Sequence, residues 1–193
     1  GIAKETAKIN AEIIAESYNK IGCDAFSPGS KDFALGLTNL MNLYSMSDFD
    51  YVSCNIAYEN NPSKLLFKPY KIIKRNNKNV GIIGLSSVFK SDGIVISSPI
   101  ATLKTIIDEV DKKSDIVILL FNSTDQDLNK LYDEDFNIDL IIKSNKGATR
   151  SNDGGGKIPT FLAGNRGKVL YEFTLSLNEV DMPFVDIAWC NNT

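Results

Sequence analysis

Hydrophobic positions recur along the chain at two alternating periods, one typical of helices and one typical of strands. Residues 4–20 place Ile9, Ile13 and Tyr18 at helical spacing, with charged residues on the other faces. Residues 115–121 are almost continuously apolar, as in a strand that is buried on both faces. The pattern also predicts helices at 33–44, 100–113 and 124–133, and strands at 23–26, 50–56, 66–75, 80–86, 138–142, 158–163 and 169–177.

Strands and helices of these lengths, in this alternating order, predict a layered α/β domain. Residues 60–63 and 164–168 have turn composition, and the turn at 76–79 joins two neighbouring strands into a hairpin. The chain has 193 residues, of which 43% are hydrophobic, so it is long enough to bury one sizeable core. We therefore expect a single domain over residues 1–193.

The stretch from Cys23 to Gly36 has the layout of a strand, a loop and a helix, which is where α/β proteins place reactive groups. Gly29 is expected to adopt a backbone conformation that other residues avoid. Asp32 is expected near the start of the following helix. This stretch is therefore the first candidate for a functional site.

The same stretch resembles the second metal motif of the calcineurin-like metallophosphatases, in the bacterial 5′-nucleotidase and UDP-sugar hydrolase branch. The matching positions are Cys23-Asp24-Ala25, Gly29, Phe33 and Gly36. Further matches are Ser53-Cys54-Asn55, Phe67-Lys68-Pro69-Tyr70 and Val80-Gly81-Ile82-Ile83-Gly84-Leu85, so the resemblance covers roughly residues 18–178. It implies an α-β-β-α sandwich of mixed sheets flanked by helices, with the family's first strand absent from this chain.

The resemblance fails at the positions that carry the family's chemistry. Members of the family clamp a phosphate ester between two divalent metal ions. In the loop, Ser30 replaces a ligand Asn, Lys31 replaces a His that stabilises the transition state, and Asp32 replaces Glu. Lys31 is hypothesised to fill the lost metal position with its own positive charge.

The later metal motifs are also degenerate. Asn122 occupies the place of one metal-binding His, and Asn145 and Gly147 occupy the places of two more. The chain contains no histidine at all. No cofactor or metal is therefore expected, and only Asn122 and Asn145 remain as weak candidate ligands, better suited to calcium than to zinc. Lys143 and Lys146 are expected to be solvated loop charges.

Composition excludes several classes of partner. The net charge of -3 and pI near 5.1 give no support for nucleic-acid binding. No apolar run is long enough to span a membrane. The three cysteines form no CxxC pair, so a zinc or haem cluster is not expected.

The leading interpretation is a catalytically inactive domain that acts as a binding, scaffold or interaction module, with an unidentified protein partner or a small anionic ligand. One alternative is an active phosphoesterase whose metals are held by Asp24, Asp32, Asn122, Asn145 and residues outside this chain. Another is a structural domain that assembles through an open sheet edge, as a homodimer. The resemblance implies a periplasmic, envelope or extracellular location, and two family motifs that belong before residue 1 suggest a fragment of a longer protein.

Overall fold

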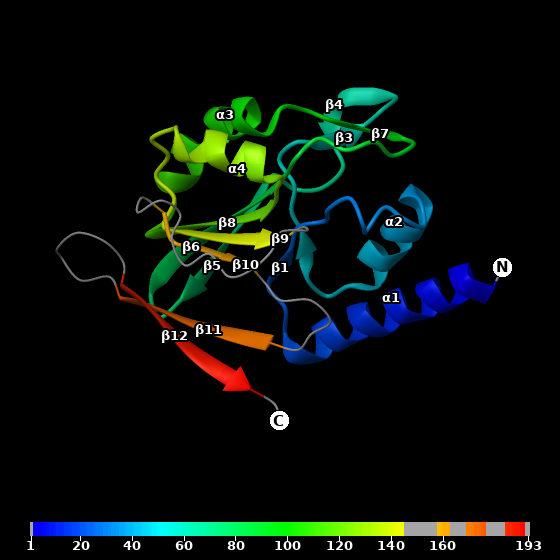
Figure 1. Cartoon of the computed structure of the whole chain (residues 1–193), viewed down its shortest axis with the longest axis horizontal. Helices are drawn as coiled ribbons and strands as arrows, with labels where there is room; N and C mark the ends of the chain where they lie inside the picture. The colour runs from blue at the N-terminus through cyan, green and yellow to red at the C-terminus, as the bar shows by residue number, and fades with distance from the viewer. Residues whose placement is uncertain (1, 145–157, 163–168, 177–183, 192–193) are drawn as a thin grey trace.

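A mixed five-stranded sheet forms the centre of the molecule in the computed structural model, which describes residues 2–144, 158–162, 169–176 and 184–191 (Figure 1). Its strand order is β10-β9-β8-β6-β5. All neighbours are parallel except β5, which runs antiparallel to β6 at one edge. The strands are β5 (Tyr70–Arg75), β6 (Lys78–Ser86), β8 (Ile116–Asn122), β9 (Leu140–Ser144) and β10 (Thr160–Leu162).

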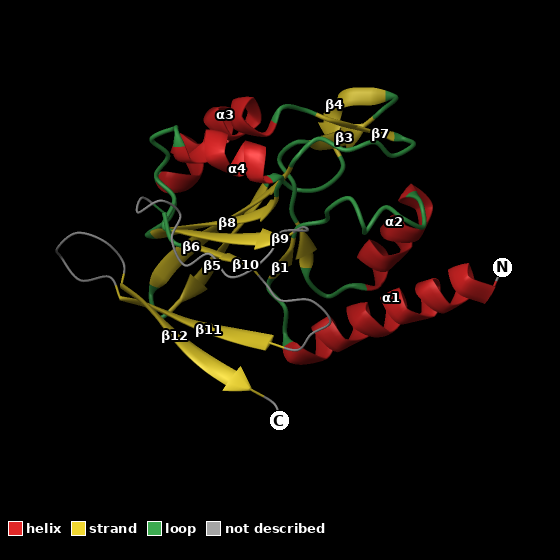
Figure 2. Cartoon of the chain, in the orientation of Figure 1, coloured by secondary structure: helices red, strands yellow, loops and turns green. Residues whose placement is uncertain are grey.

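Helices α3 (Pro99–Asp111) and α4 (Asp125–Tyr132) lie on one face of this sheet (Figure 2). Pro99 begins α3, where its missing N–H costs no hydrogen bond. The main core lies between these helices and the sheet. Its fully buried members are Ile83, Leu85, Leu103, Val110, Val117, Leu119, Phe121, Leu131 and Ile141.

A second assembly contains α1 (Ile2–Ile21), β1 (Ala25–Phe26), α2 (Leu37–Met46) and β2 (Asp50–Tyr51). β1 and β2 pair in parallel. Beside them, β3 (Ile56–Tyr58), β4 (Asn61–Leu65) and β7 (Ile94–Ile96) form an antiparallel sheet of order β4-β3-β7. An aromatic cluster holds this region together, in which Tyr51 contacts the rings of Phe26, Tyr44, Phe49 and Phe67.

A hairpin of β11 (Val169–Ser176) and β12 (Phe184–Asn191) lies on the side of the central sheet opposite to α3 and α4 (Figure 1). The sequence predicted β11 but not β12. The predicted layered α/β fold with mixed sheets and flanking helices is confirmed. Within the part of the chain that the structure describes, no helix has the length and apolarity needed to cross a membrane.

Three local predictions were wrong. Residues 50–56 form two short strands and not one, because residues 52–55 leave β2 and cross the end of β6. Gly84 permits this crossing, since a Cβ there would lie 2.0 Å from the carbonyl oxygen of Val52. The predicted turn at 60–63 lies mostly within β4, and α2 begins four residues late, at Leu37, after Gly36 adopts a φ of 85°.

The predicted hairpin between residues 66–75 and 80–86 is confirmed as β5 and β6. Asn76 and Asn77 have positive φ values of 47° and 63° at its turn. Paired positive φ values match the right-handed twist of the strands, and Asn tolerates them better than most residues. The turn therefore sets the register of β5 against β6.

Candidate functional site

The carboxyl ends of three parallel strands bring polar side chains together. The register pairs Ser86 of β6 with Asn122 of β8, and Asn122 with Ser144 of β9. We call these three residues the polar edge. The amide nitrogen of Asn122 donates a hydrogen bond to the Ser144 hydroxyl at 3.0 Å. Because α/β sheets bind ligands at the carboxyl ends of their strands, this is where a site is expected.

The loop at residues 27–32 packs directly against the polar edge. A Cβ placed on Gly29 would lie 2.3 Å from both Cγ and Nδ2 of Asn122. Gly29 is not among the glycines with positive φ, so the predicted special backbone conformation was wrong. Glycine is needed here for space, because the Asn122 side chain occupies the volume that a Cβ would fill. The contact brings two of the predicted site segments together.

Asp32 is held within its own loop. Its Oδ2 accepts a hydrogen bond from the backbone N–H of Gly29 at 2.8 Å, and its own N–H donates to the Gly29 carbonyl at 3.0 Å. Although the residue lies at the surface, loop atoms crowd its carboxyl group, and this burial raises the pKa of Asp32 above its ordinary value. Asp32 precedes α2 and does not cap it, so the carboxylate serves the turn.

Lys31 and Lys143, the two lysines near the site, both differ from what the sequence predicted. Lys31 is exposed and forms no ion pair with the described residues, so the hypothesis that it neutralises a lost metal position was wrong. Lys143, expected to be solvated, is only 7% exposed at the end of β9. Its ammonium pairs with Asp125 at the start of α4. A buried ammonium requires such a partner, so this pair ties α4 to the sheet.

Asn55 is a residue of this region that the sequence did not single out by itself. Its side-chain nitrogen donates to the carbonyls of Ser86 (2.6 Å) and Ser97 (3.0 Å), and its oxygen accepts from the Ser86 N–H at 3.1 Å. It is 1% exposed. Asn55 thus holds the end of β6 in place. Its position in the Ser53-Cys54-Asn55 segment, which matches the family, was the sequence signal that could have identified it.

Buried hydroxyl groups are unusually frequent around the polar edge. The side-chain oxygens of Ser27, Ser53 and Ser123 are buried without a hydrogen-bond partner in the described structure. Ser27 approaches β6, since its oxygen would lie 2.9 Å from a Cβ on Gly84. Such groups are usually satisfied by buried water. They are neutral, and none of them is a strong ligand for a transition metal.

The described residues do not fit a two-metal clamp. They contain no group of three or more His, Cys, Asp or Glu side chains arranged to hold a metal ion. Beside the polar edge they offer three carboxylates that are already engaged, Asp32 by Gly29, Asp125 by Lys143 and Asp127 by Ser87. Two hard dications require several carboxylate or imidazole ligands. Asn145, Lys146 and Gly147 lie outside the described residues.

Asp24 lies away from the polar edge. Its carboxylate pairs with Arg75 at 2.6 Å. Arg75 is opposite Lys78, at the beginning of β6, whereas Ser86 is at the end of the same strand. Asp24 is therefore at the amino end of the sheet, and the predicted set of Asp24, Asp32 and Asn122 does not come together.

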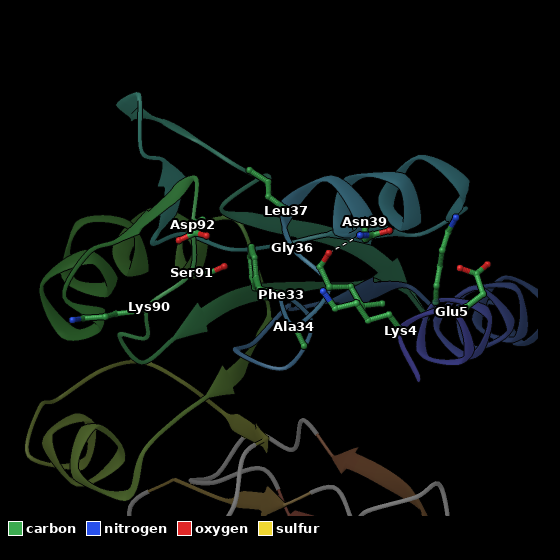
Figure 3. Close-up of a pocket in the computed structure, with 12 residues that line it drawn as sticks. Lys4, Glu5, Phe33, Ala34, Gly36, Leu37, Asn39, Lys90, Ser91 and Asp92 are labelled. Atoms are coloured by element: carbon green, nitrogen blue, oxygen red, sulfur yellow. Dashed lines mark hydrogen bonds between the residues drawn. The ribbon is translucent and has the colours of Figure 1, made fainter. Parts of the chain in front are cut away.

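A groove of about 690 Å³ lies beside the turn that follows the loop (Figure 3). Lys4 and Lys8 of α1 line one wall, and Lys90 and Asp92 line another, with Phe33 between them. The polar edge does not line this groove. The groove has a mixture of charges that suits a polar molecule. It assembles no group suited to acid–base or nucleophilic chemistry.

Comparison with known proteins identifies the fold. The sequence is 33% identical to Protein UshA from Salmonella pullorum over 78 residues, which are 40% of this chain and 14% of UshA. The structure matches a putative 5′-nucleotidase from Staphylococcus aureus with a TM-score of 0.73 and 17% identity, over 94% of this chain and 40% of that one. It matches the calcineurin-like phosphoesterase YfkN from Bacillus subtilis with a TM-score of 0.70 and 18% identity, over 95% and 66%. No protein-family model matches the sequence.

These similarities confirm the predicted calcineurin-like phosphoesterase fold and its 5′-nucleotidase-like form. The chain spans less than half the length of UshA and of the staphylococcal protein. Their activities therefore cannot be transferred to this domain by similarity, and function has to be argued from its own residues.

Proposed function

We propose that this domain, which has the fold of 5′-nucleotidases and calcineurin-like phosphoesterases, is catalytically inactive and acts as a binding, scaffold or interaction module. The observation that supports this most is the chemistry of the polar edge. Where a phosphoesterase needs several free anionic or imidazole ligands, the described residues supply neutral side chains and carboxylates that other protein groups engage. The absence of histidine from the whole sequence removes the usual ligands and acid–base groups.

The ammonium of Lys143 also argues against a metal clamp. It is buried at the end of β9, one residue before Ser144 of the polar edge. A fixed positive charge there disfavours a nearby dication, in particular because only one partner carboxylate, Asp125, compensates it. We propose accordingly that the domain holds neither of the two divalent ions that its fold accommodates in active members. Its ligand is then a protein partner or a small anion.

Calorimetric titration with manganese, zinc and calcium, followed by assay of the same samples on a generic phosphodiester and a nucleotide, tests this proposal. We expect no stoichiometric binding and no turnover. Asp32→Ala and Asn122→Ala are matched controls, because a contaminating phosphatase gives the same trace activity in all samples. Binding of two ions per chain with turnover that both variants abolish would overturn the proposal.

The competing function is a metal-dependent phosphoesterase with non-histidine ligands. Among its proposed ligands in the described structure, Asp32 and Asn122 each lie beside Gly29. Asp24 is engaged by Arg75 at the other end of the sheet. This alternative consequently needs most of its ligands from residues outside the described part of the chain.

Assembly through an open sheet edge, the third function considered, is disfavoured at β5. This edge strand carries Lys71, Lys74 and Arg75, and charged side chains oppose the addition of another strand. For location we propose the periplasm, the cell envelope or the outside of the cell, because the branch that the sequence resembles is mostly exported. Fractionation of cells that make the native protein tests this, and recovery in the cytosol would contradict it.

A further inference from the structure

The central sheet is covered unequally on its two faces. Strand β8 is the middle strand of that sheet, and its side chains alternate between the faces. Toward α3 and α4, Val117, Leu119 and Phe121 are at most 1% exposed. On the opposite face, Ile118 and Leu120 are only partly buried. Because the inner strands of a parallel sheet are normally buried on both faces, this difference indicates an incomplete covering layer.

The partly exposed surface extends into the neighbouring strand. Leu120 of β8 is paired with Ile142 of β9, which is also only partly buried. We call Ile118, Leu120 and Ile142 the sheet patch. Asn122 and Ser144 of the polar edge are the next residues on the same face, since each lies two positions further along its strand. The sheet patch is therefore an apolar surface that ends at the polar edge.

Two short sheets lie in the layer over this face. Ala25 of β1 packs against Val80 and Ile82 of β6, and the β11–β12 hairpin lies on the same side of the central sheet (Figure 1). β1–β2 and β11–β12 are separate two-stranded sheets, with no strand between them among the described residues. A two-stranded sheet is marginally stable by itself, and three or more strands are usually needed. Both sheets therefore favour the addition of a strand.

The hairpin lacks the features that protect an edge strand. The edge strand β5 of the central sheet carries Lys71, Lys74 and Arg75. By contrast, β11 contains one charged residue, Glu172, and β12 contains one, Asp186, although each strand is 8 residues long and neither contains proline. Charged residues and proline are common means of preventing another strand from adding to an edge. The hairpin edge is thus open to strand addition where β5 is not.

We propose that an extended segment of a separate polypeptide adds to the free edge of the hairpin, on the side of β1, and covers the sheet patch. An added strand satisfies the row of backbone N–H and C=O groups along that edge, and its alternate side chains point toward the sheet. The partner segment is therefore apolar at every second position, over about six to eight residues. A place bordered by β1–β2 and by the hairpin admits a strand, which is about 4.8 Å wide, but not the side of a folded second copy. The inference rests on the interaction role proposed above and specifies the chemistry of the partner.

Hydrogen exchange, measured for individual amides of the intact chain, tests the proposal. The probe is a synthetic peptide of about ten residues that alternates valine with threonine or lysine, at concentrations up to about 1 mM. In the chain alone we expect fast exchange at the free edge of the hairpin. The peptide should slow this exchange about tenfold and leave β6 and β8 unchanged. The control peptide has proline at alternate positions, which removes the N–H groups that pair with an edge.

Leu120→Thr tests whether the added strand covers the sheet patch. Removing the apolar side chain should weaken the effect of the peptide about five- to twenty-fold. Val88→Thr is the matched control, because Val88 is an apolar residue that is 60% exposed in the loop after β6. Circular dichroism checks that both variants remain folded. An equal effect of the peptide on both variants would contradict the proposed location.

Three further results would overturn the proposal. The first is no effect of the alternating peptide, and the second is an equal effect of the proline peptide. The third is slow exchange at the hairpin edge in the chain alone, which would mean that this chain covers its own edge or, if protection rises with protein concentration, that a second copy does. A failed peptide test without metal binding or turnover would leave the proposal of catalytic inactivity standing. Turnover together with a positive peptide test would remove only that proposal.

Discussion

The polar edge and helix α1 place opposite kinds of side chain in opposite kinds of environment. At the polar edge, hydrophilic groups are hydrogen-bonded to one another, as Asn122 is to the exposed Ser144 and the buried Asn55 is to Ser86. On α1, apolar side chains stand in water without a partner. The first arrangement engages polar groups in hydrogen bonds within the protein, and the second leaves apolar groups exposed to water.

This difference indicates which groups of the domain are available to a ligand or partner. A catalytic site needs polar groups that are available to a substrate, yet Asn122 and Ser144 are bonded to each other and the unpaired hydroxyl groups of Ser27, Ser53 and Ser123 are buried. An interaction site needs apolar surface that can be removed from water, and α1 supplies it.

The largest effect on stability should come from truncating an isoleucine that is buried in the core. Ile107 of α3 is 4% exposed within the main core. Ile107→Ala should lower the free energy of unfolding by about 2–5 kcal/mol, since it removes buried carbons and leaves a cavity. The same truncation on α1, Ile13→Ala at a residue that is 54% exposed, should change it by less than about 0.5 kcal/mol in dilute solution. Urea unfolding measures both, and equal losses would mean that α1 is covered in solution.

Asn55→Ala should produce the next largest loss, about 2–3 kcal/mol in the same measurement. The substitution leaves the buried carbonyl and N–H groups of Ser86 without their partner, and unsatisfied buried groups are costly. Asn137→Ala is the matched control, since Asn137 is exposed and makes one hydrogen bond, to Asp111. A loss no larger than that of the control would mean that the polar edge is open to water rather than closed.

Gly29→Ala should cost about 1–3 kcal/mol, because the new Cβ displaces the Asn122 side chain and breaks its hydrogen bond to Ser144. Asn122→Ala removes the atoms that clash. In a double-mutant cycle the pair should therefore be less harmful than the sum of the single changes. Additive losses would show that the loop and β8 are not in contact, and that the site segments are separate.

Local patterns predicted those parts of the fold that local chemistry determines. The apolar runs at 80–86 and 115–121 became β6 and β8, and the Asn76–Asn77 turn joins β6 to β5. Pro62 was interpreted as part of a turn, but it lies in β4, at the edge of its sheet, where proline is tolerated. The neutral character of the polar edge also followed from the sequence, since Asn122 stood where a metal ligand was expected.

The remaining features depend on contacts between distant residues. Lys143 lies at the end of an apolar strand, which was a signal of burial, but its partner Asp125 belongs to α4. Gly29 was expected to serve the backbone, whereas its role is to make room for a side chain 93 positions later in the sequence. No local pattern encodes such a distance, so these residues could be recognised as unusual but not explained.

The smallest predicted effect concerns Asp32, the only carboxylate of the loop at residues 27–32. Burial raises the pKa of Asp32, so the folded protein holds this proton more tightly than the unfolded chain does. The contribution of Asp32 to stability should accordingly fall as the pH rises from about 3 to about 6. Relative to Asp32→Asn, the wild type should lose a few tenths of a kcal/mol over this range, because the surface position weakens the effect.

Urea unfolding at several pH values measures this difference, with Asp135→Asn at an exposed position as the baseline. Asparagine can still accept the hydrogen bond from the Gly29 N–H through its side-chain oxygen, so the comparison isolates the charge. A wild type that gains stability with rising pH would mean that the Gly29 hydrogen bond and the charge of Lys31 outweigh burial. The carboxylate would then be stabilised in its ionised form, and the loop would keep an anionic ligand that the closed polar edge otherwise lacks.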